Sequence, residues 1–504
     1  MPAFDFVIIG SGLGGLECGY ILAKEGKSVC VLEKNRQFGG TLQIFSRDKA
    51  IFDAGVHYIG GLMPGQVLHR FFEYFNLNEK LNLKRLDEDC FDQISFGHSG
   101  ERFSLAQDKA NFKEQLLKHF PKEEKALEHY LKDITEVGKQ AAFHNLDINP
   151  GDFELSSAHQ LSIGDYLDGL TSNSKLKSVL AGNNLLYAGN PNKTPFYVHS
   201  IIEDSYIESA WKCVDGSGQI AKHLVEGIRN FGGEVRNYSE VKSIETTNGK
   251  ACAVVLSCGE RLACMNIVAN IHPIELFKML NPGTLRPAYT NRVSGLDNSI
   301  GAFLLNIVLK PASFPYLNYN IYHHENENVF TTDYQPETWP QTMAIFCPAG
   351  KSTGEFAESL TVMCYLKMEE VKDWEGSFRT IPKHEQSRGE GYEEFKERKS
   401  QQIIAKLETV FPQIRGLIKS YSAQTPLTYR DYLATPNGSM YGITMDSQSP
   451  MKYVLSSRQR IENIFLSGQN LNLHGVLGVT VSAVVTCSDI LGKDYLLPKF
   501  RKGN

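Results

Sequence analysis

A run of glycines between an apolar segment and a helix-like segment is the feature that most constrains this chain. Residues 4–9 read FDFVII, residues 10–15 read GSGLGG, and residues 16–25 carry apolar side chains at helical spacing before Gly26. This order predicts a buried strand, a tight turn and a helix. A further apolar segment, residues 28–33, predicts a second parallel strand, so that the opening residues form a right-handed βαβ unit.

The glycine spacing is that of a dinucleotide-binding turn. Gly10 permits the tight turn, Gly12 lets the main chain approach a pyrophosphate, and Gly15 brings the helix against the strand. The helix start at Leu13 and Gly14 offers unpaired N–H groups to the phosphates. Glycine turns also occur for structural reasons alone, so the pattern is a weak signal by itself.

A carboxylate at the expected distance strengthens the interpretation. Glu33 follows Gly15 by 33 − 15 = 18 residues and stands at the end of the second predicted strand. A carboxylate there accepts hydrogen bonds from ribose hydroxyls, and its charge disfavours the 2′-phosphate of NADP. The alternative is a surface glutamate at a strand end.

Length and composition exclude several other classes of protein. The chain has 504 residues, 42% hydrophobic and 22% charged, which is typical of a globular protein of about three lobes. Its net charge of −5 and lack of a basic tract argue against nucleic acid as a partner. The ten cysteines show no metal-binding spacing, so we expect no metal site and a reducing, cytoplasmic location. The longest apolar tract, 476–485, is too short to cross a bilayer, which leaves peripheral membrane contact only.

The residues after Glu33 go beyond what a plain NAD-binding unit requires. The segment contains Lys34 and Arg36 and then Gly39, Gly40 and Thr41. This order resembles the extended FAD motif, in which the arginine supports the pyrophosphate region and the paired glycines let the loop pass beside the cofactor. A structural turn is the alternative for the two glycines.

The next segment, residues 52–61, reads FDAGVHYIGG. With it, the chain resembles the phytoene desaturase, carotenoid isomerase and retinol saturase superfamily of FAD-dependent oxidoreductases, and it is most similar to the retinol saturase (all-trans-retinol 13,14-reductase) branch. The likeness is dense at residues 4–62, 213–273 and 428–492. Desaturases usually carry a basic residue where this chain has Thr41, which weakens a desaturase assignment. The resemblance adds Gly55, Val56, His57 and Val241 to the expected cofactor contacts.

The C-terminal region supplies a second predicted half of the cofactor site. Residues 463–466 predict a strand that ends in Gly468 and Gln469, and residues 474–485 predict an apolar helix. In the resembled family this turn and helix start lie beside the isoalloxazine ring. The partial positive charge of a helix N-terminus would stabilise a reduced flavin. The expected contacts here are Gly475, Val476, Leu477 and Gly478; a buried structural helix is the alternative.

These elements predict an α/β fold with two discontinuous domains. A Rossmann-like FAD-binding domain, a parallel sheet with helices, would comprise residues 1–62, 213–282 and 455–504. An α+β substrate-binding domain would comprise residues 63–212 and 283–454. The latter should begin with an amphipathic helix over 66–77, whose aromatic face is either core or a lipid tunnel. For His323 and His324 we expect an exposed turn.

The resemblance implies chemistry on a lipophilic small molecule, a long apolar polyene similar to a retinoid or carotenoid. One C=C bond would be saturated by hydride transfer from flavin N5 and protonation. His57, Tyr58 and Tyr441 are the candidate proton donors, although each could be a buried side chain satisfied by a main-chain partner. Because no second glycine fingerprint follows, NADH or NADPH would visit only transiently, or an electron-donor protein would reduce the flavin.

Two other functions stay open. The same fold could isomerise a carotenoid without net redox change, or desaturate it if an electron acceptor were present. GDP-dissociation inhibitors share this ancestry and bind partner proteins without flavin, so a non-enzymatic lipid or protein carrier is the second alternative. The intact glycines and Glu33 argue against a carrier.

Overall fold

The opening apolar segment forms β1 (Phe4–Ile9), which lies inside a seven-stranded sheet. In this computed structural model, residues 4–97, 100–141, 146, 156–350, 354–378 and 388–501 are described. The strands follow the order β10 (Glu234–Arg236), β2 (Val29–Leu32), β1, β13 (Arg261–Ala269), β12 (Lys250–Leu256) and β11 (Val241–Thr247), and β19 (Ile464–Leu466) also pairs with β13.

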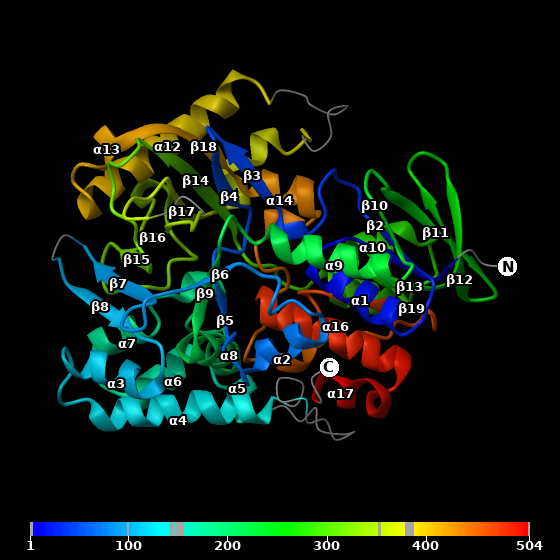
Figure 1. Ribbon diagram of the computed structural model, residues 1–504, viewed down its shortest axis with the longest axis horizontal. Coiled ribbons are helices and arrows are strands. Elements are labelled where there is room, and N and C mark those ends of the chain that lie inside the picture. The colour runs from blue at the N-terminus through cyan, green and yellow to red at the C-terminus, as the bar shows by residue number, and fades with distance from the viewer. Residues whose placement is uncertain are drawn as a thin grey trace.

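The strands around β1 are parallel, which confirms the predicted Rossmann-like fold. β10, β2, β1, β13 and β19 pair in parallel, whereas β11 and β12 form an antiparallel hairpin that continues into β13. Strands from the beginning, middle and end of the chain therefore lie side by side (Figure 1). Their carboxyl ends meet at one edge, where a doubly wound sheet binds its ligand.

One face of this sheet carries α10 (Pro273–Met279) and side chains of the β11–β12 hairpin. Helices that pack on one another cover the opposite face. They include α1 (Leu13–Lys24), α9 (Gly218–Asn230) and α16 (Gly475–Leu491) (Figure 1). α1 packs against α9 and α16, because Gly19 and Gly227 leave room for close neighbours. A Cβ added at Gly227 would lie 2.2 Å from the Tyr20 ring. The last helix, α17 (Lys493–Arg501), packs through Phe500 on α2 (Val67–Tyr74).

The aromatic face of α2 is core. This helix is the amphipathic segment predicted over 66–77, and its side chains Phe71 and Phe72 are fully buried. Phe75 follows directly and packs edge-on against Phe500. The alternative of a lipid tunnel at this face is therefore wrong.

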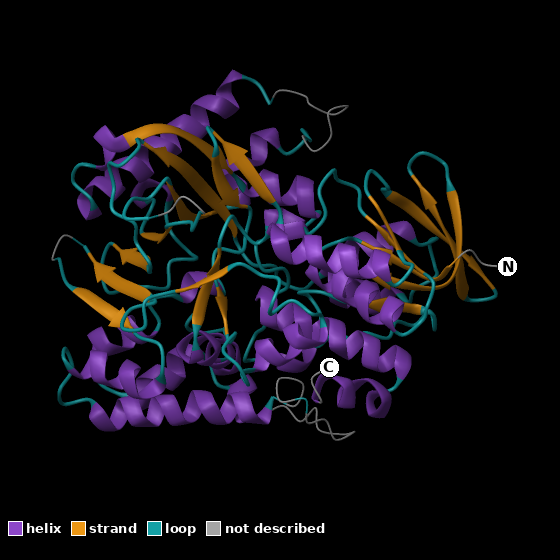
Figure 2. Ribbon diagram, viewed as in Figure 1, coloured by secondary structure: helices purple, strands orange, loops and turns teal. Residues whose placement is uncertain are grey.

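The second domain contains a mixed sheet with helices on both sides (Figure 2). Its strands follow the order β18 (Ile418–Gln424), β14 (Gly301–Leu309), β17 (Ser359–Leu366), β16 (Thr342–Phe346), β15 (Asn320–His324), β7 (Asp92–Phe96) and β8 (Arg102–Leu105). The helices include α3 (Lys109–Leu117), α4 (Glu124–Gln140), α6 (Ile163–Leu170), α7 (Ser174–Leu180), α8 (Phe196–Glu208), α12 (Glu390–Val410) and α14 (Pro426–Leu433).

Two small sheets connect the domains. The segment after the extended motif forms a hairpin of β3 (Ile44–Arg47) and β4 (Ala50–Asp53). β5 (Ile59–Gly60) then pairs with β9 (Ala210–Cys213), which also pairs with β6 (Leu83–Arg85). Because β5 directly follows His57 and Tyr58, these two side chains lie where the chain enters the second domain.

The expectation of an exposed turn at His323 and His324 is wrong. Both lie on the buried strand β15 and are 4% and 0% exposed. His324 is held by the Thr342 hydroxyl and the Gly182 carbonyl, at 3.0 and 2.7 Å, so its polar atoms are satisfied without solvent. Their side chains point to opposite faces of the sheet, as strand geometry requires.

Two findings bear on the expected surroundings of the chain. Within the described residues, no helix is both long enough and apolar enough to cross a membrane. In the same part of the chain, no group of three or more His, Cys, Asp or Glu side chains is placed to hold a metal ion. From its charged composition the segment 373–399 is expected to be a surface loop that leads into a helix. Residues 379–387 of it lie outside the described residues, and α12 begins within the segment, at Glu390.

We expect Gly15→Ala to destabilise the first domain by about 2 kcal/mol or more. A Cβ at this position would lie 2.1 Å from the carbonyl oxygen of Gly10, and main chain cannot move aside cheaply. Urea denaturation measures the change. Gly169→Ala is the matched control: no heavy atom lies within 4 Å of its Cβ position in α6, and alanine should stabilise that helix by about 1 kcal/mol. Equal stability of Gly15→Ala and wild type would contradict the predicted packing.

Candidate functional site

The first glycine turn and the paired glycines lie against each other. Gly10 has φ +95, and Gly39 pairs with Gly12 in a parallel bridge and has φ +111. A Cβ added at Gly40 would lie 3.0 Å from the Cα of Gly12. Only glycines allow this approach, so the predicted motif folds as two stacked main-chain turns.

Asn270 fills the centre of this edge of the sheet. It follows β13, and its main-chain N–H donates to the Ile9 carbonyl at 2.9 Å. A Cβ added at Gly14 would lie 2.9 Å from Asn270 Oδ1 and 3.3 Å from the Cα of Gly468. The structure therefore brings the turn after β1 and the turn after β19 together on the two sides of Asn270.

Glu33 directly follows β2, and each of its carboxylate oxygens accepts hydrogen bonds from the protein. Its Oε2 accepts from the Ser11 main-chain N–H at 3.2 Å and from the Ser11 hydroxyl at 2.5 Å. Its Oε1 accepts from the Asn35 N–H at 2.8 Å, and the residue is 6% exposed. An ionised carboxylate has about four acceptor positions, so it can still accept hydrogen bonds from a ribose.

Two helices begin at this edge without a capping side chain. Gly12 precedes α1 and His474 precedes α16; neither caps its helix with a side-chain hydrogen bond, and neither first turn carries an acidic residue. Free N–H groups at a helix start attract negative charge. Gly475, with φ +75, has no heavy atom within 4 Å of its Cβ position. The residues present therefore fit a dinucleotide whose phosphates lie at α1 and whose far end lies at α16.

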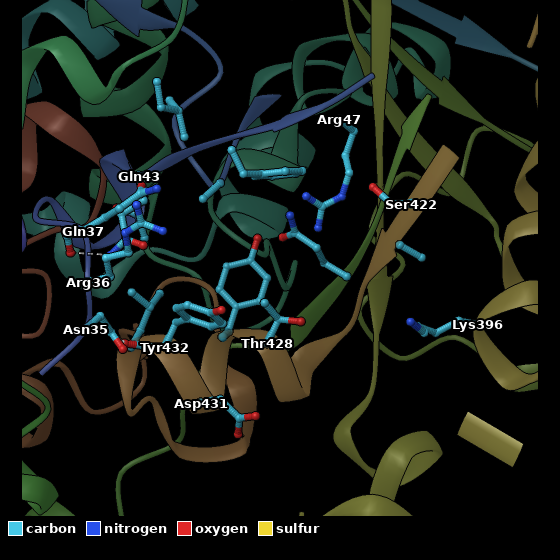
Figure 3. Close-up of a pocket in the computed structure, with 18 of the residues that line it drawn as sticks. Asn35, Arg36, Gln37, Gln43, Arg47, Lys396, Ser422, Thr428, Asp431 and Tyr432 are labelled. Atoms are coloured by element: carbon cyan, nitrogen blue, oxygen red, sulfur yellow. Dashed lines mark hydrogen bonds between the residues drawn. The ribbon is translucent and has the colours of Figure 1, made fainter. Parts of the chain in front are cut away.

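A cavity of about 890 Å³ flanks the extended motif (Figure 3). On one side it is lined by Arg36, Gly40 and Thr41 of the predicted cofactor contacts, and on the other by α12, α14 and β18. Arg47 and Lys396 point toward it, whereas the side chain of Asp431 on α14 points away. The predicted motif therefore borders an open space between the two domains.

His57 is half-buried beside this motif. Gly55, two residues before His57, lies against Thr41 of the extended motif: a Cβ added at Gly55 would lie 3.2 Å from the Thr41 Cβ. The His57 ring stacks on Phe346 with centroids 4.4 Å apart, and its Nε2 has no partner within the described residues. Burial, with a contribution from the charge of Lys212, lowers the pKa of His57 to about 4, so the imidazole is neutral at pH 7.

Tyr58 is tied into a buried polar group. Its hydroxyl donates to Asp92 Oδ2 at 2.8 Å and lies 2.8 Å from the Tyr322 hydroxyl. Asn320 Nδ2 donates to the other oxygen of Asp92 at 2.9 Å. Burial raises the pKa of Asp92 to about 6 against these hydrogen bonds. Tyr58 thus has polar partners, as the structural alternative requires, and those partners are titratable.

Tyr441 is distant from α16 in the sequence but contacts His474, the residue that precedes this helix. Its ring packs on His474 with centroids 4.3 Å apart, and its hydroxyl donates to the Leu185 carbonyl at 2.7 Å. Both residues line a small cavity of about 30 Å³ together with Gln469. Tyr441 is therefore near the expected flavin end but has a main-chain partner. The roles of His57, Tyr58 and Tyr441 stay predictions.

The other predicted contacts divide between the edge and the core. Leu13, Val56, Val476 and Leu477 pack in the apolar cluster beneath α1 and α16. Gly478 lets the first turn of α16 pack against Leu473, since a Cβ at Gly478 would lie 2.6 Å from that residue. Lys34 Nζ donates to the Asp431 carbonyl at 2.8 Å. Val241 is 5% exposed and belongs to the same buried cluster as Ile9 and Leu32.

Sequence reasoning did not single out Asn270 or Asp92. The position of Asn270 directly after a strand beside β1 was an available signal, because ligand-contacting residues follow such strands. The sequence contains no comparable signal for Asp92, since one acidic residue in a polar segment cannot be distinguished from a surface charge.

Comparison with known proteins agrees with this geometry. Residues 8–75 match the NAD(P)-binding Rossmann-like domain family. The chain is 26% identical to all-trans-retinol 13,14-reductase of Danio rerio, over 98% of this chain and 87% of the relative. It is 23% identical to chloroplastic prolycopene isomerase of Daucus carota, over 96% of this chain and 79% of the relative.

A solved structure shares the whole fold. An oxidoreductase from Methanosarcina mazei superposes with a TM-score of 0.62 at 16% identity, over 95% of this chain and 98% of that one. The architecture of both domains, and not only the glycine turn, is thus found in a known oxidoreductase.

We expect Tyr58→Phe to destabilise the protein by about 1–2 kcal/mol, because a buried carboxylate loses a donor. The loss should be larger above pH 6, where Asp92 is ionised, than at pH 5, where it is neutral. Chemical denaturation at several pH values measures it. Tyr166→Phe is the control, since its hydroxyl donates at 2.9 Å to the more exposed Asp133 and should matter less. A pH-independent loss in Tyr58→Phe would contradict the Asp92 contact.

Proposed function

We propose that this chain, which is similar over nearly its whole length to all-trans-retinol 13,14-reductases and prolycopene isomerases, is an FAD-dependent oxidoreductase that saturates one C=C bond of a long apolar polyene. The observation that carries the proposal is the meeting of Gly14 and Gly468 at Asn270. It joins the predicted adenosine end at Glu33 to the predicted flavin end at α16 in one continuous edge.

The chain's own residues would hold FAD from one end to the other. Glu33 would bind the ribose, and the N–H groups of the first turn of α1 would bind the pyrophosphate. Arg36 would support the phosphates from the adjacent cavity. The start of α16, from Gly475, would place partial positive charge beside the ring.

When bound, FAD would supply the hydride, which is the difficult part of the chemistry. The protein then has to orient a double bond at about 3–3.5 Å from the reacting atom and exclude water. The aromatic side chains of Phe346, Tyr206 and Tyr441 would form the apolar wall near His57 and Tyr58. A proton must also reach the second carbon of the double bond.

A reductase is favoured over the isomerase and the desaturase by two observations. The identity to the Danio rerio reductase is 26%, against 23% for the carrot isomerase. Thr41 also stands where desaturases usually carry a basic residue. A carrier without flavin is disfavoured, because the glycines around Gly12 and the carboxylate of Glu33 have no role in it.

The proposal includes the partners and the location. Electrons would come from a transient NADH or NADPH or from an electron-donor protein, and the lipophilic substrate would be drawn from a membrane that the protein contacts peripherally. The cytoplasm is the proposed compartment, since all ten cysteines are free thiols.

The purified protein should be yellow and release FAD on denaturation. Incubated anaerobically with dithionite and a panel of retinoids and carotenoids, it should yield a product heavier by two hydrogens. An unchanged mass with altered geometry would support the isomerase, and a loss of two hydrogens in the presence of an acceptor would support the desaturase. A colourless protein that cannot be reconstituted with FAD would contradict the whole proposal.

We expect Glu33→Gln to weaken FAD binding about tenfold, the effect of losing a hydrogen bond to a charged acceptor. Titration of the apoprotein with FAD, followed by flavin fluorescence, measures the affinity. Glu73→Gln, at an exposed position on α2, is the control and should bind as wild type does. Unchanged affinity in Glu33→Gln would place the adenosine end elsewhere.

A further inference from the structure

A buried chain of polar side chains extends from Tyr58 into the second domain. Asn183 Nδ2 donates to Asp92 Oδ2 at 3.4 Å and to Glu203 Oε2 at 3.1 Å. Asp92 and Asn183 are 0% exposed and Glu203 is 1% exposed. Two carboxyl groups from different elements, β7 and α8, are thus bridged by one amide far from solvent.

The charges around this bridge do not balance if both carboxyl groups are ionised. Lys212 is 2% exposed, and its Nζ donates to the carbonyls of Leu317 and Cys347 at 3.1 and 2.9 Å. Its positive charge favours the ionised form of Asp92. Among the described residues, no cation lies within ion-pair distance of Glu203. One buried positive charge therefore compensates one carboxylate, and the other carboxyl is more stable neutral.

Glu203 is the carboxyl that keeps its proton. Burial, and secondarily the charge of Asp92, raise its pKa to about 8. The titratable groups around Glu203 are Tyr130, Tyr187 and Tyr206. Those around Asp92 are Tyr58, Tyr206, Tyr322, Lys212 and Cys90, a thiol whose pKa is raised by burial. Burial raises the pKa of each of these tyrosines, so they remain neutral and add no charge.

The proton of Glu203 is not committed to a structural hydrogen bond. Glu203 Oε1 is buried and has no partner within the described residues, and neither has Asn183 Oδ1. A purely structural buried acid would normally donate to a fixed acceptor. The unused oxygen leaves this acid free to release its proton.

None of the three proton donors expected from the sequence can store the proton as an acid that titrates near pH 7, so each would have to be resupplied by another group. His57 is neutral at pH 7, and burial raises the pKa of Tyr58 and Tyr441 above that of an ordinary tyrosine. An effective acid has a pKa near the working pH, and in this cluster only a protonated carboxyl meets that condition.

We propose that Glu203 stores the proton that completes the saturation of the C=C bond, and that Asp92 and Tyr58 carry it to the segment beside the predicted flavin site. The proposal rests on the proposed function. Bound, reduced FAD would supply a hydride to one alkene carbon, and the neighbouring carbon would take the hydroxyl proton of Tyr58. Asp92, a carboxylate at pH 7, would take the proton that Glu203 releases across the bridging Asn183 amide and pass it to Tyr58. Glu203 would then stay a carboxylate until solvent reprotonates it.

The first test needs no substrate. The infrared spectrum of the FAD-loaded protein at pH 7 should contain the C=O band of a buried carboxylic acid that shifts in D2O. Glu203→Gln should lose one component of this band, and the remaining component belongs to Glu17, whose pKa is also raised by burial. Asp204→Asn should keep both components, because Asp204 is the next residue on α8 and pairs with Lys109 at 2.8 Å instead. A band that persists unchanged in Glu203→Gln would overturn the proposal whatever the substrate is.

The second test follows a single turnover of the reduced, FAD-loaded protein with a polyene. The wild-type rate should fall about tenfold per pH unit above pH 8, where Glu203 loses its proton. Glu203→Gln should be slowed about 100-fold and lose this pH dependence, and Asp204→Asn should keep both the rate and the profile. A wild-type rate and profile in Glu203→Gln would overturn the role of Glu203.

The two proposals fail separately. A carboxylic acid band that is lost in Glu203→Gln, in a wild-type protein that reduces no polyene, would contradict the proposed function but not the protonation of Glu203. If Glu203→Gln does not fold, Glu203→Met has similar length without a titratable group and replaces it in both measurements. Bound flavin absorbance and an unchanged Tm verify that either variant is folded.

Discussion

The contact of two glycine turns across Asn270 is the constraint on which the rest of the site depends. A Cβ at Gly12 or Gly14 would lie 2.9 Å from the Asn270 side chain, and one at Gly468 would lie 2.5 Å from it. The three segments can meet only because β1, β13 and β19 are parallel neighbours that end at the same edge. Two helix N-termini without side-chain caps therefore begin at one edge of the sheet, which is an electrostatic arrangement suited to a dinucleotide.

The second domain is joined to this edge through one short segment. Residues 54–60 leave the hairpin of β3 and β4, pass Thr41 and enter the sheet of β5, β6 and β9. His57 and Tyr58 lie in that segment, with Phe346 and Tyr206 stacked on them. The same short stretch therefore borders the cofactor edge on one side and the buried carboxyl groups on the other.

Much of the nucleotide-binding half could be predicted from the sequence, because it depends on local signals. Period-two and helical apolar patterns, together with glycines at fixed spacing, predict β1, α1, β2, β19 and α16 without knowledge of their neighbours. Glu33 could be predicted for the same reason. The parallel pairing of β13 with β1 follows from the family resemblance and not from residues 261–269 themselves.

The remaining features depend on long-range packing, which a sequence pattern does not contain. Glu203 and Asp204 are adjacent and chemically alike, yet one is buried against Asn183 and the other pairs with Lys109. The sequence around His323 and His324 is typical of a polar turn, but these residues form a buried strand because β7 and β16 pair on either side of it. The cavity beside Arg36 arises only where α12, α14 and β18 meet the extended motif.

A crystal structure of the FAD-loaded protein tests the central claim most directly. The account predicts continuous density for one cofactor, with the adenosine ribose at Glu33, the phosphates at the first turn of α1 and the tricyclic ring at Gly475–Gly478. A cofactor whose ring lies away from α16, or whose adenosine occupies the cavity between Arg47 and Lys396, would contradict it.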